Sequence, residues 1–433
     1  MSKLYDTLKN IANSIKSKKE ISENEYDNDE NKIKPKDFYN EVLLLSAHTL
    51  AKNMVDDDGS GIPVIKNLII SGNIENGTIL SNAFKNTSIV TVTFEDGVKT
   101  INSNAFNSCD NIQEFNTGVV KTIYSQAFSY CGSLTKLVVS EHTTYIASDV
   151  THSSSSLSSI EVDENNPVYD SRNNCNAVMA TTDIHSPTTG ELIFVKNTLI
   201  SGCKTTIIPE GTVALANSSF AGKWFESINL PDSVKEIHNY AFQNCSYLKS
   251  INLNNVEYIN TASFVNCTGL TSIDLSNIKS ITQGAFTTCT AIKEVNTNNL
   301  LGWCMATFGN YLATPVYWSR SLKLNGNLIT DLTIPDEITK LGNYVFGYCK
   351  NITRVKFPAN ISSLGSYAFV SCTSCLEYDF SSKTEGKIPT ITTTTFYGTQ
   401  PEGWKIKVPQ SRLEEWKSAT NWAALPEGVI IGV

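Results

Sequence analysis

The sequence has 433 residues, with 34 Lys and Arg against 42 Asp and Glu, so its formal net charge is −8. Proteins that bind nucleic acid neutralise phosphates with clustered basic residues, so an acidic chain without a basic cluster argues against that class. No stretch approaches the ~18 consecutive apolar residues of a membrane span, so no membrane insertion is expected. Hydrophobic residues make up 41% of the chain, which is sufficient for a sizeable core.

Residues 1–52 form a first region with its own composition. Apolar residues at helical spacing predict a short helix within residues 3–17: Leu4, Leu8, Ile11 and Ile15. An acidic, Asn-rich linker follows at 20–31. A second short helix is predicted after Pro35, with three apolar residues on one face: Phe38, Val42 and Leu45. The N-terminus lacks the apolar run of about 7–15 residues that a secretory signal needs, so the chain is expected to stay in the cell that makes it or to enter a particle assembled there.

Two segments of this region, Ile11-Ala-Asn-Ser-Ile15-Lys and Ile33-Lys-Pro-Lys-Asp-Phe38, resemble a short N-terminal module of phage structural proteins and prophage tail-region proteins. The resemblance implies that residues 1–45 anchor the chain to other virion proteins. The alternative is that this region only caps the part of the chain that follows it.

Aromatic residues return at a fixed period in the central region. Ala105-Phe106-Asn107-Ser108-Cys109 is followed 22 residues later by Ala127-Phe128-Ser129-Tyr130-Cys131. The same series includes further phenylalanines: Phe84, Phe220, Phe242, Phe264, Phe286, Phe308, Phe346 and Phe369. A period of 20–29 residues predicts a solenoid in which each repeat forms one coil. Irregular inserts interrupt the period near 140–205 and near 299–330.

Each repeat carries two local signals. The alternation of Ile273 and Leu275 predicts a short strand, and the Ala-Phe-x-x-Cys segment predicts a helical or 3₁₀ turn. The predicted fold is therefore an α/β repeat solenoid of ~22-residue units with one parallel β-sheet, preceded by the short N-terminal helices. Residues 399–433 are predicted to cap it with a strand, a short helix around Leu413 and Trp416, and a last strand at Val429–Val433.

The repeat pattern, Ala-Phe-x-x-Cys-x-x-Leu-x-x-Ile-x-Leu-Pro, resembles the BspA-like leucine-rich repeats of bacterial, phage and protist surface proteins. The match covers about residues 64–398, within a solenoid domain expected at 53–398. Residues 166–178 and 322–335 resemble recurring units of the same family. The resemblance implies a protein that recognises cell-surface or host molecules.

Seven of the eleven cysteines occupy one repeat offset: Cys109, Cys131, Cys245, Cys267, Cys289, Cys349 and Cys372. They are expected to be buried, free thiols that pack as small apolar groups, although stacked coils would bring pairs within disulfide range. The five histidines are scattered, and no nucleophile elbow, zinc motif or phosphate loop is present. We therefore expect no enzymatic activity, no cofactor and no metal.

The remaining candidates lie on the predicted surface. Outward-facing strand residues are expected to stack in columns on one sheet: Glu114, Asn116, Lys136, Val138, Ser250, Asn252, Ser272, Asp274, Glu294, Asn296, Arg354 and Lys356. These columns could bind a glycan or a polar protein surface, or merely keep the sheet soluble. Aromatic residues of the second insert could stack on sugars if exposed, or fill the irregular coil if buried: Trp303, Tyr311, Tyr317 and Trp318.

These observations predict a non-enzymatic binding protein whose partner is a cell-surface protein or glycan. The N-terminal resemblance favours a tail-associated, receptor-binding component of a phage or prophage virion. The alternatives are a bacterial or protist adhesin displayed at the cell surface, and a structural spacer without a specific ligand.

Overall fold

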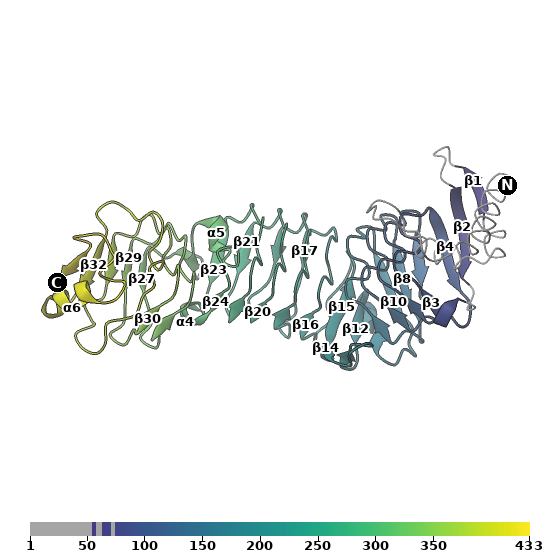
Figure 1. Ribbon diagram of the computed structural model, residues 1–433, viewed down its shortest axis with the longest axis horizontal. Helices are drawn as coiled ribbons and strands as arrows, with labels where there is room; N and C mark the ends of the chain where they lie inside the picture. Colours follow the sequence, from purple (N-terminus) through teal and green to yellow (C-terminus); the bar gives the residue numbers. More distant parts are fainter. Residues whose placement is uncertain (1–53, 58–62, 71–73) are drawn as a thin grey trace, which may run out of the picture. The chain divides into compact units, whose positions relative to one another are not determined.

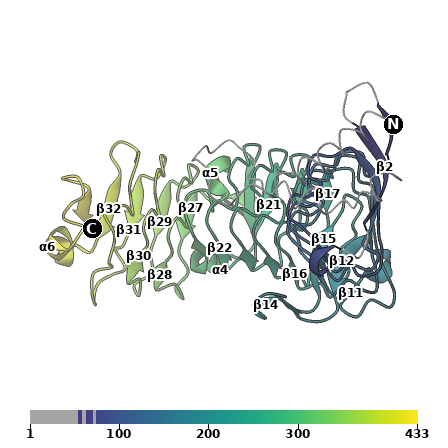
Figure 2. The same cartoon turned by 45° about the vertical axis from the view of Figure 1, so that its right-hand side comes forward.

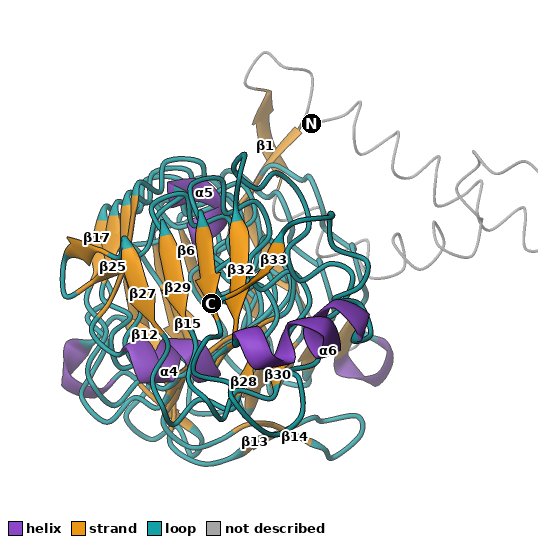
Figure 3. Ribbon diagram, turned by 90° about the vertical axis from the view of Figure 1, so that its left-hand side faces the viewer, coloured by secondary structure: helices purple, strands orange, loops and turns teal. Residues whose placement is uncertain are grey.

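The computed structural model describes residues 54–57, 63–70 and 74–433, so the N-terminal helices predicted within residues 1–52 lie outside it. The chain divides into two compact units. Unit 1 comprises the described residues up to Lys196 together with Ile200–Thr206, and unit 2 comprises Asn197–Leu199 and Ile207–Val433. Each unit is a β-solenoid of stacked coils, and Figure 3 shows how few helices accompany the short strands and loops.

In unit 1 each regular coil contributes two short parallel strands to two different sheets. One row pairs Thr78 with Thr100 and Thr100 with Thr122, and consists of β3 (Thr78–Ile79), β5 (Thr100–Ile101), β7 (Thr122–Ile123) and β9 (Tyr145–Ile146). The other row consists of β6 (Glu114–Asn116), β8 (Lys136–Val139) and β10 (Ser159–Val162). A third sheet joins β1 (Met54–Asp57), β2 (Pro63–Ile70) and β4 (Ile89–Phe94). The first insert of the sequence adds β11 (Tyr169–Asp170), β12 (Ala177–Ala180), the hairpin of β13 (Ile184–His185) and β14 (Leu192–Phe194), and β15 (Thr198–Gly202), whose first two residues belong to unit 2.

Unit 2 repeats this arrangement (Figure 1). From β15 onward, one row continues through β16 (Ala214–Leu215), β18 (Glu236–Ile237), β20 (Tyr258–Ile259), β22 (Ser280–Ile281) and β24 (Thr307–Phe308). The other row is formed by β17 (Ser227–Ile228), β19 (Ser250–Ile251), β21 (Ser272–Asp274), β23 (Glu294–Thr297), β25 (Lys323–Leu324) and β26 (Asn327–Leu328).

In the last coils of unit 2 the two rows of strands again form two separate sheets, as Figure 2 shows. One sheet consists of β27 (Asp331–Thr333), β29 (Arg354–Lys356), β31 (Glu377–Asp379), β32 (Lys405–Val408) and β33 (Ile430–Gly432), and the other of β28 (Lys340–Leu341) and β30 (Ser363–Leu364). The prediction of a single parallel sheet is therefore wrong. The second strand of each coil has only two residues, too few to show an alternating pattern in the sequence.

The Ala-Phe-x-x-Cys segments are successive turns, so the predicted helical or 3₁₀ turn is wrong. The residues two before and two after each phenylalanine have positive φ, as at Asn104 and Ser108 around Phe106. These left-handed residues turn alternate peptide groups toward the neighbouring coil, where Phe106 N donates to Ala127 O (2.9 Å). Asparagine and glycine, which tolerate this conformation best, occupy many of these positions, for example Asn86, Asn244, Asn266, Gly222 and Gly284.

The phenylalanines at these turns form the predicted ladder in the core. In unit 2 the rings of Phe220, Phe242, Phe264 and Phe286 stack with centroids 5.2–5.3 Å apart and planes within 8° of parallel. In unit 1 Phe106 stacks between Phe84 and Phe128.

Phe308 does not belong to the ladder, although its spacing predicts that it should. It lies in β24 opposite Ile281 and packs against Trp303, with ring centroids 5.3 Å apart. The insert between Phe286 and Phe346 lengthens this coil, so the chain reaches the strand position 22 residues after Phe286, where a regular coil would place a turn.

The repeated cysteines are hydrogen-bond donors as well as packing groups, and all eleven cysteines are buried and form no disulfide. Each Sγ donates to the main-chain carbonyl of the phenylalanine in the preceding coil, over 3.0–3.3 Å, at Cys109, Cys131, Cys245, Cys267, Cys289 and Cys372. Burial raises the pKa of Cys245 and Cys289 to about 12, so these thiols stay protonated and able to donate at neutral pH. In other coils Ser154, Trp318 and Gln400 donate to the equivalent carbonyls. We call these side chains together the donor column.

The donor column predicts unequal losses of stability for two substitutions at Cys267. Cys267→Val removes the Sγ donor from the Phe242 carbonyl, which keeps only its bond from Cys245 N, and is expected to lower the free energy of unfolding by about 0.5–1.5 kcal/mol. Cys267→Ser retains a donor, as Ser154 does in its own coil, and is expected to cost less. Urea unfolding of both variants tests this, and a valine variant as stable as the serine variant would show that packing alone explains the cysteines.

The described residues contain three α-helices, each of at most six residues. In unit 2, α4 (Leu300–Met305) and α5 (Val316–Ser319) belong to the second insert, and α6 (Leu413–Ser418) follows β32. Short 3₁₀ turns lie at Glu75–Gly77, Arg172–Asn174 and Gln410–Arg412. The strand, helix and last strand predicted after residue 399 are confirmed as β32, α6 and β33.

Candidate ligand-binding surfaces

The predicted strand residues of unit 1 lie in register on neighbouring strands. Glu114 is opposite Lys136, and the buried residues Phe115 and Leu137 alternate with them. Lys136 Nζ lies 2.9 Å from Glu161 Oε2 and 3.9 Å from Glu114 Oε1, so its charge is shared by two carboxylates. Val138 lies opposite Asn116 and is half-buried.

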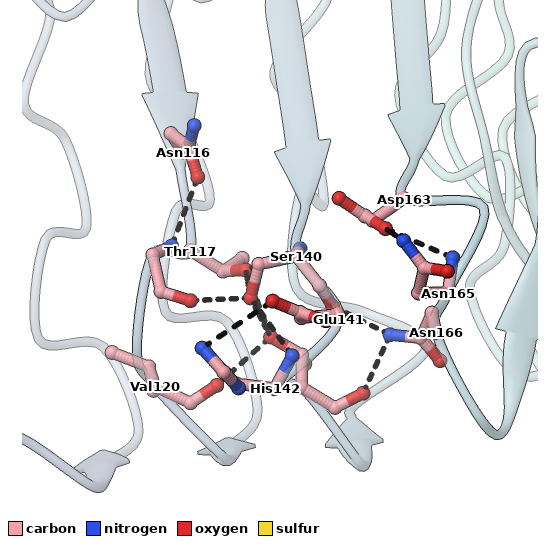
Figure 4. A network of polar contacts seen from close by, with 11 residues as sticks. Asn116, Thr117, Val120, Ser140, Glu141, His142, Asp163, Asn165 and Asn166 are labelled. Atoms are coloured by element: carbon pink, nitrogen blue, oxygen red, sulfur yellow. Dashed lines mark hydrogen bonds and ion pairs between the residues drawn. The ribbon is translucent and has the colours of Figure 1, made fainter.

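A polar network fixes the ends of these strands (Figure 4). Asn116 Oδ1 accepts from Gly118 N over 2.9 Å, which closes the turn after β6. Ser140 N donates to Thr117 Oγ1 (2.8 Å), and Asn166 Nδ2 donates to the carbonyl of Ser140 (2.6 Å). Asn116 therefore has a structural partner in the coil itself.

In unit 2 the predicted residues form two adjacent columns: Ser250, Ser272 and Glu294 in one, and Asn252, Asp274 and Asn296 in the other. Asn296 Nδ2 donates to Asp274 Oδ1 over 2.8 Å, and Asn252 Oδ1 accepts from Asn254 N over 3.1 Å. Glu294 Oε1 lies 2.8 Å from Lys323 Nζ. Ser250 remains exposed at one end of its column.

Arg354 and Lys356 lie on the last sheet of unit 2. Arg354 lies 2.8 Å from Glu377 Oε1 and 2.9 Å from Asp379 Oδ2, and Glu377 also pairs with Lys407. Burial alone would raise the pKa of Asp379, but hydrogen bonds from Ser381 and Arg354 hold it below its usual value. Lys356 is exposed on the same strand. Most charged residues of these strand columns are thus paired with neighbouring charged side chains, as on an ordinary protein surface.

The aromatic residues of the second insert divide between core and surface. Trp303 is buried, with 1% of its surface exposed, and its Nε1 donates to Val345 O over 2.8 Å. It therefore fills the irregular coil, and its ring cannot contact a ligand. Trp318 is half-buried in α5, and its Nε1 donates to Phe286 O as part of the donor column. Tyr317, its neighbour, lines an open pocket.

This pocket has a volume of about 470 Å³ and lies on unit 2; its lining residues are Tyr311, Tyr317, Arg320, Tyr348, Lys350, Ser371, Thr373 and Thr399. The Arg320 guanidinium lies 4.5 Å from the ring centroid of Tyr317 and 5.3 Å from that of Tyr348. Lys350 N donates to Arg320 O over 2.7 Å, which ties the two cationic residues together. Among the described residues, neither Arg320 nor Lys350 has a carboxylate within ion-pair distance.

The local backbone explains how these side chains converge. α5 ends at Ser319, and the left-handed conformation of the next residue, Arg320 (φ 59°), turns the chain sharply after a single helical turn. Tyr348 occupies the left-handed position two residues after Phe346, and Tyr344 and Tyr367 occupy the equivalent position before their phenylalanines. Burial raises the pKa of Tyr348 to about 12, so its hydroxyl stays protonated at neutral pH.

Sequence reasoning missed Arg320, Tyr348 and Lys350 as pocket residues. A signal was present at Tyr348, because tyrosine stands there at a turn position that asparagine, serine, threonine or glycine fills in most other coils. Tyrosine has a positive φ at Tyr130, Tyr240, Tyr344 and Tyr367 as well, so this signal does not by itself single out Tyr348. Nothing in the sequence indicated that Arg320 and Lys350, which are 30 positions apart, would line the same pocket.

Two further findings concern the described part of the chain. None of its helices is both long and apolar enough to cross a membrane. Within the same residues, no three His, Cys, Asp or Glu side chains lie together as metal ligands would.

The solenoid and its repeats can be compared with known proteins. A leucine-rich repeat protein from Eubacterium ventriosum is 18% identical over 78% of this chain and 95% of its own, with a TM-score of 0.42. A leucine-rich repeat protein from Bacteroides ovatus is 16% identical over 88% of this chain and 97% of its own, with a TM-score of 0.37. The pneumococcal vaccine antigen PcpA is 16% identical over 87% of this chain and 80% of its own, with a TM-score of 0.36. No curated protein matches the chain.

The family comparison agrees with the buried pattern of the coils. The model of the BspA type leucine-rich repeat region matches six copies, over residues 64–177, 213–310 and 324–415, which is more than half of the chain. These segments contain the phenylalanine ladder and most of the donor column. The chain therefore belongs to the BspA-type leucine-rich repeat family.

Proposed function

We propose that this protein is a non-enzymatic adhesion protein of a cell surface, which binds an extracellular molecule through unit 2. One observation carries the proposal: Arg320 and Lys350 line an open, tyrosine-rich pocket without a carboxylate partner among the described residues. Arg354 and Lys323 of the same unit are paired with carboxylates, and Lys340 and Lys356 are exposed singly, whereas Arg320 and Lys350 share one pocket with three tyrosines.

The size and lining of the pocket support binding. Its volume falls within the roughly 300–1,000 Å³ of small-ligand sites, and a few polar groups converge on it among aromatic rings. Tyr348 forms part of the pocket wall and holds the Arg320 guanidinium by a cation–π contact at 5.3 Å. The strand columns of Ser272, Asp274, Glu294 and Asn296 are a second candidate surface on the same unit.

Family membership supports a binding role for the solenoid that we place at 53–398, closed by a cap at 399–433. A virion role depended on residues 1–45, which lie outside both the described residues and the matched segments. We therefore propose the cell-surface form, and the virion form stays a prediction from the sequence.

The variant Tyr348→Asn tests the proposal with little risk to folding, because asparagine fills the equivalent left-handed position at Asn244 and Asn266. The full chain is applied to immobilised extracellular-matrix proteins and glycans, and binding to at least one of them is expected to weaken tenfold or more in the variant. Tyr130→Asn makes the same exchange at the same repeat position in unit 1 and is expected to bind as the wild type does.

Three results would count against this proposal in different ways. Absence of binding by the wild type would favour a spacer. Binding that survives Tyr348→Asn but is lost when Ser272, Asp274, Glu294 and Asn296 are replaced together would move the site to the strand columns. Equal loss in Tyr130→Asn would show that the effect does not depend on the pocket.

A further inference from the structure

We infer that the pocket of unit 2 recognises an acidic sugar, a pyranose that carries a carboxylate or a sulfate group. This inference rests on the proposed function, since it names the ligand class of the same pocket. It follows from three features of the lining: its charge, its aromatic rings and its hydroxyl groups.

The charge of the lining is positive in a chain whose net charge is −8. Arg320 and Lys350 contribute two cations, and no acidic residue lines the pocket. Arginine suits a carboxylate or sulfate because its planar guanidinium donates two parallel hydrogen bonds to two oxygens. The rings of Tyr317 and Tyr348 hold that guanidinium by cation–π contact at 4.5 and 5.3 Å, so less side-chain freedom is lost when an anion binds.

The aromatic rings provide the apolar part of the site. Tyr317 meets Tyr311 and Tyr348 edge to face, with ring centroids 5.1 and 5.0 Å apart, so the three rings form one wall. Tyr311 keeps 41% of its surface exposed. A pyranose has one face of C–H groups that packs against such rings, while its hydroxyls point sideways.

The hydroxyl groups complete the match to a sugar. Ser371, Thr373 and Thr399 line the pocket beside the tyrosines, and each hydroxyl both donates and accepts. A phosphopeptide would also use the two cations, but its backbone offers amide groups where a sugar offers a ring of hydroxyls. The wall of three tyrosine rings therefore favours the sugar, because the C–H face of a pyranose packs against it.

Matched pairs of glycans on one array test the inference. Each acidic member is accompanied by its neutral parent: sialyllactose and sulfated lactose with lactose, and oligogalacturonate with its methyl ester. A phosphoserine peptide and its unmodified form are included. The full-length wild type is expected to bind at least one acidic glycan at least tenfold more tightly than its neutral parent, and binding is expected to weaken as salt is raised.

Single substitutions then assign the effect to the pocket. Arg320→Gln and Lys350→Gln are each expected to weaken binding to the acidic glycan about tenfold or more. Lys340→Gln removes an exposed charge on β28, in the same unit, and is expected to leave binding unchanged. Unfolding midpoints within 2 °C of the wild type would exclude misfolding as the cause.

The outcomes separate this inference from the proposed function. Equal binding to acidic glycans and their neutral parents, preference for the phosphopeptide, or an unchanged affinity in Arg320→Gln would overturn the acidic-sugar inference. Any of these results combined with a loss of binding in Tyr348→Asn would leave the pocket as a binding site for another ligand. If no glycan or peptide binds, the inference fails whatever the matrix-protein assay shows.

Discussion

Replacing Phe264 by alanine is expected to lower the free energy of unfolding of unit 2 by about 3–5 kcal/mol, the range for removing a large buried ring. Phe264 is fully buried and stacks between Phe242 and Phe286, at centroid distances of 5.2 and 5.3 Å. In a solenoid each coil contacts only its neighbours, so a cavity in one coil weakens two interfaces at once. Urea unfolding, followed by hydrogen exchange of unit 2, measures the loss.

An exposed aromatic residue of the same coil provides the control. Tyr258 keeps 40% of its surface exposed, and the centroid of its ring lies 5.8 Å from Lys279 Nζ. Tyr258→Ala is therefore expected to lower the free energy of unfolding by less than about 1 kcal/mol. Similar losses in Phe264→Ala and Tyr258→Ala would contradict a core built from the phenylalanine ladder.

Replacing Trp422 by alanine is expected to have a comparable effect, about 3–5 kcal/mol, at the C-terminal end of unit 2. Trp422 has only 1% of its surface exposed, and its ring lies 4.8 Å from Trp416 and 5.5 Å from Phe380. Its Nε1 also donates to Pro389 O over 2.7 Å. Loss of the ring would uncover the last coil, which is the role proposed for residues 399–433.

Two phenylalanine variants separate packing from hydrogen bonding at this end. Trp422→Phe keeps most of the apolar surface but orphans the Pro389 carbonyl, so it is expected to cost about 1–3 kcal/mol more than Trp416→Phe. Trp416 Nε1 is buried without a hydrogen-bond partner in the described part of the chain, so its removal deletes an unsatisfied donor. Thermal unfolding of both variants compares them, and a larger loss in Trp416→Phe would contradict this explanation.

How far the fold follows from the sequence depends on the length of each signal. Phe106, Phe128 and their counterparts repeat through many coils, and their period alone predicts the solenoid. The second row of strands escaped prediction because segments such as Thr100–Ile101 are only two residues long. Phe308 follows Phe286 by the regular 22 residues, but the insert places it in a strand. Its spacing therefore led to the wrong prediction that it belongs to the ladder.

The candidate site was less predictable for a different reason. Tyr317 was identified from composition, but its partners Arg320, Tyr348 and Lys350 come together only because an irregular coil folds beside a regular one. Conversely, Trp303 has the same composition signal and lies in the core. Whether an aromatic residue faces solvent in such a coil depends on the path of the backbone, which no local pattern records.

The donor column has a consequence for how this array tolerates change in coil length. A carbonyl in one coil is reached from 25 residues away by Cys109, from 26 by Ser154, from 31 by Gln400 and from 32 by Trp318. This hydrogen bond needs an N–H, O–H or S–H donor near the carbonyl, and the number of residues between the carbonyl and the donor can vary. A coil can therefore differ in length from its neighbours, provided that a side-chain donor still reaches this carbonyl, and the coil that carries Trp318 and the tyrosine pocket is such a case.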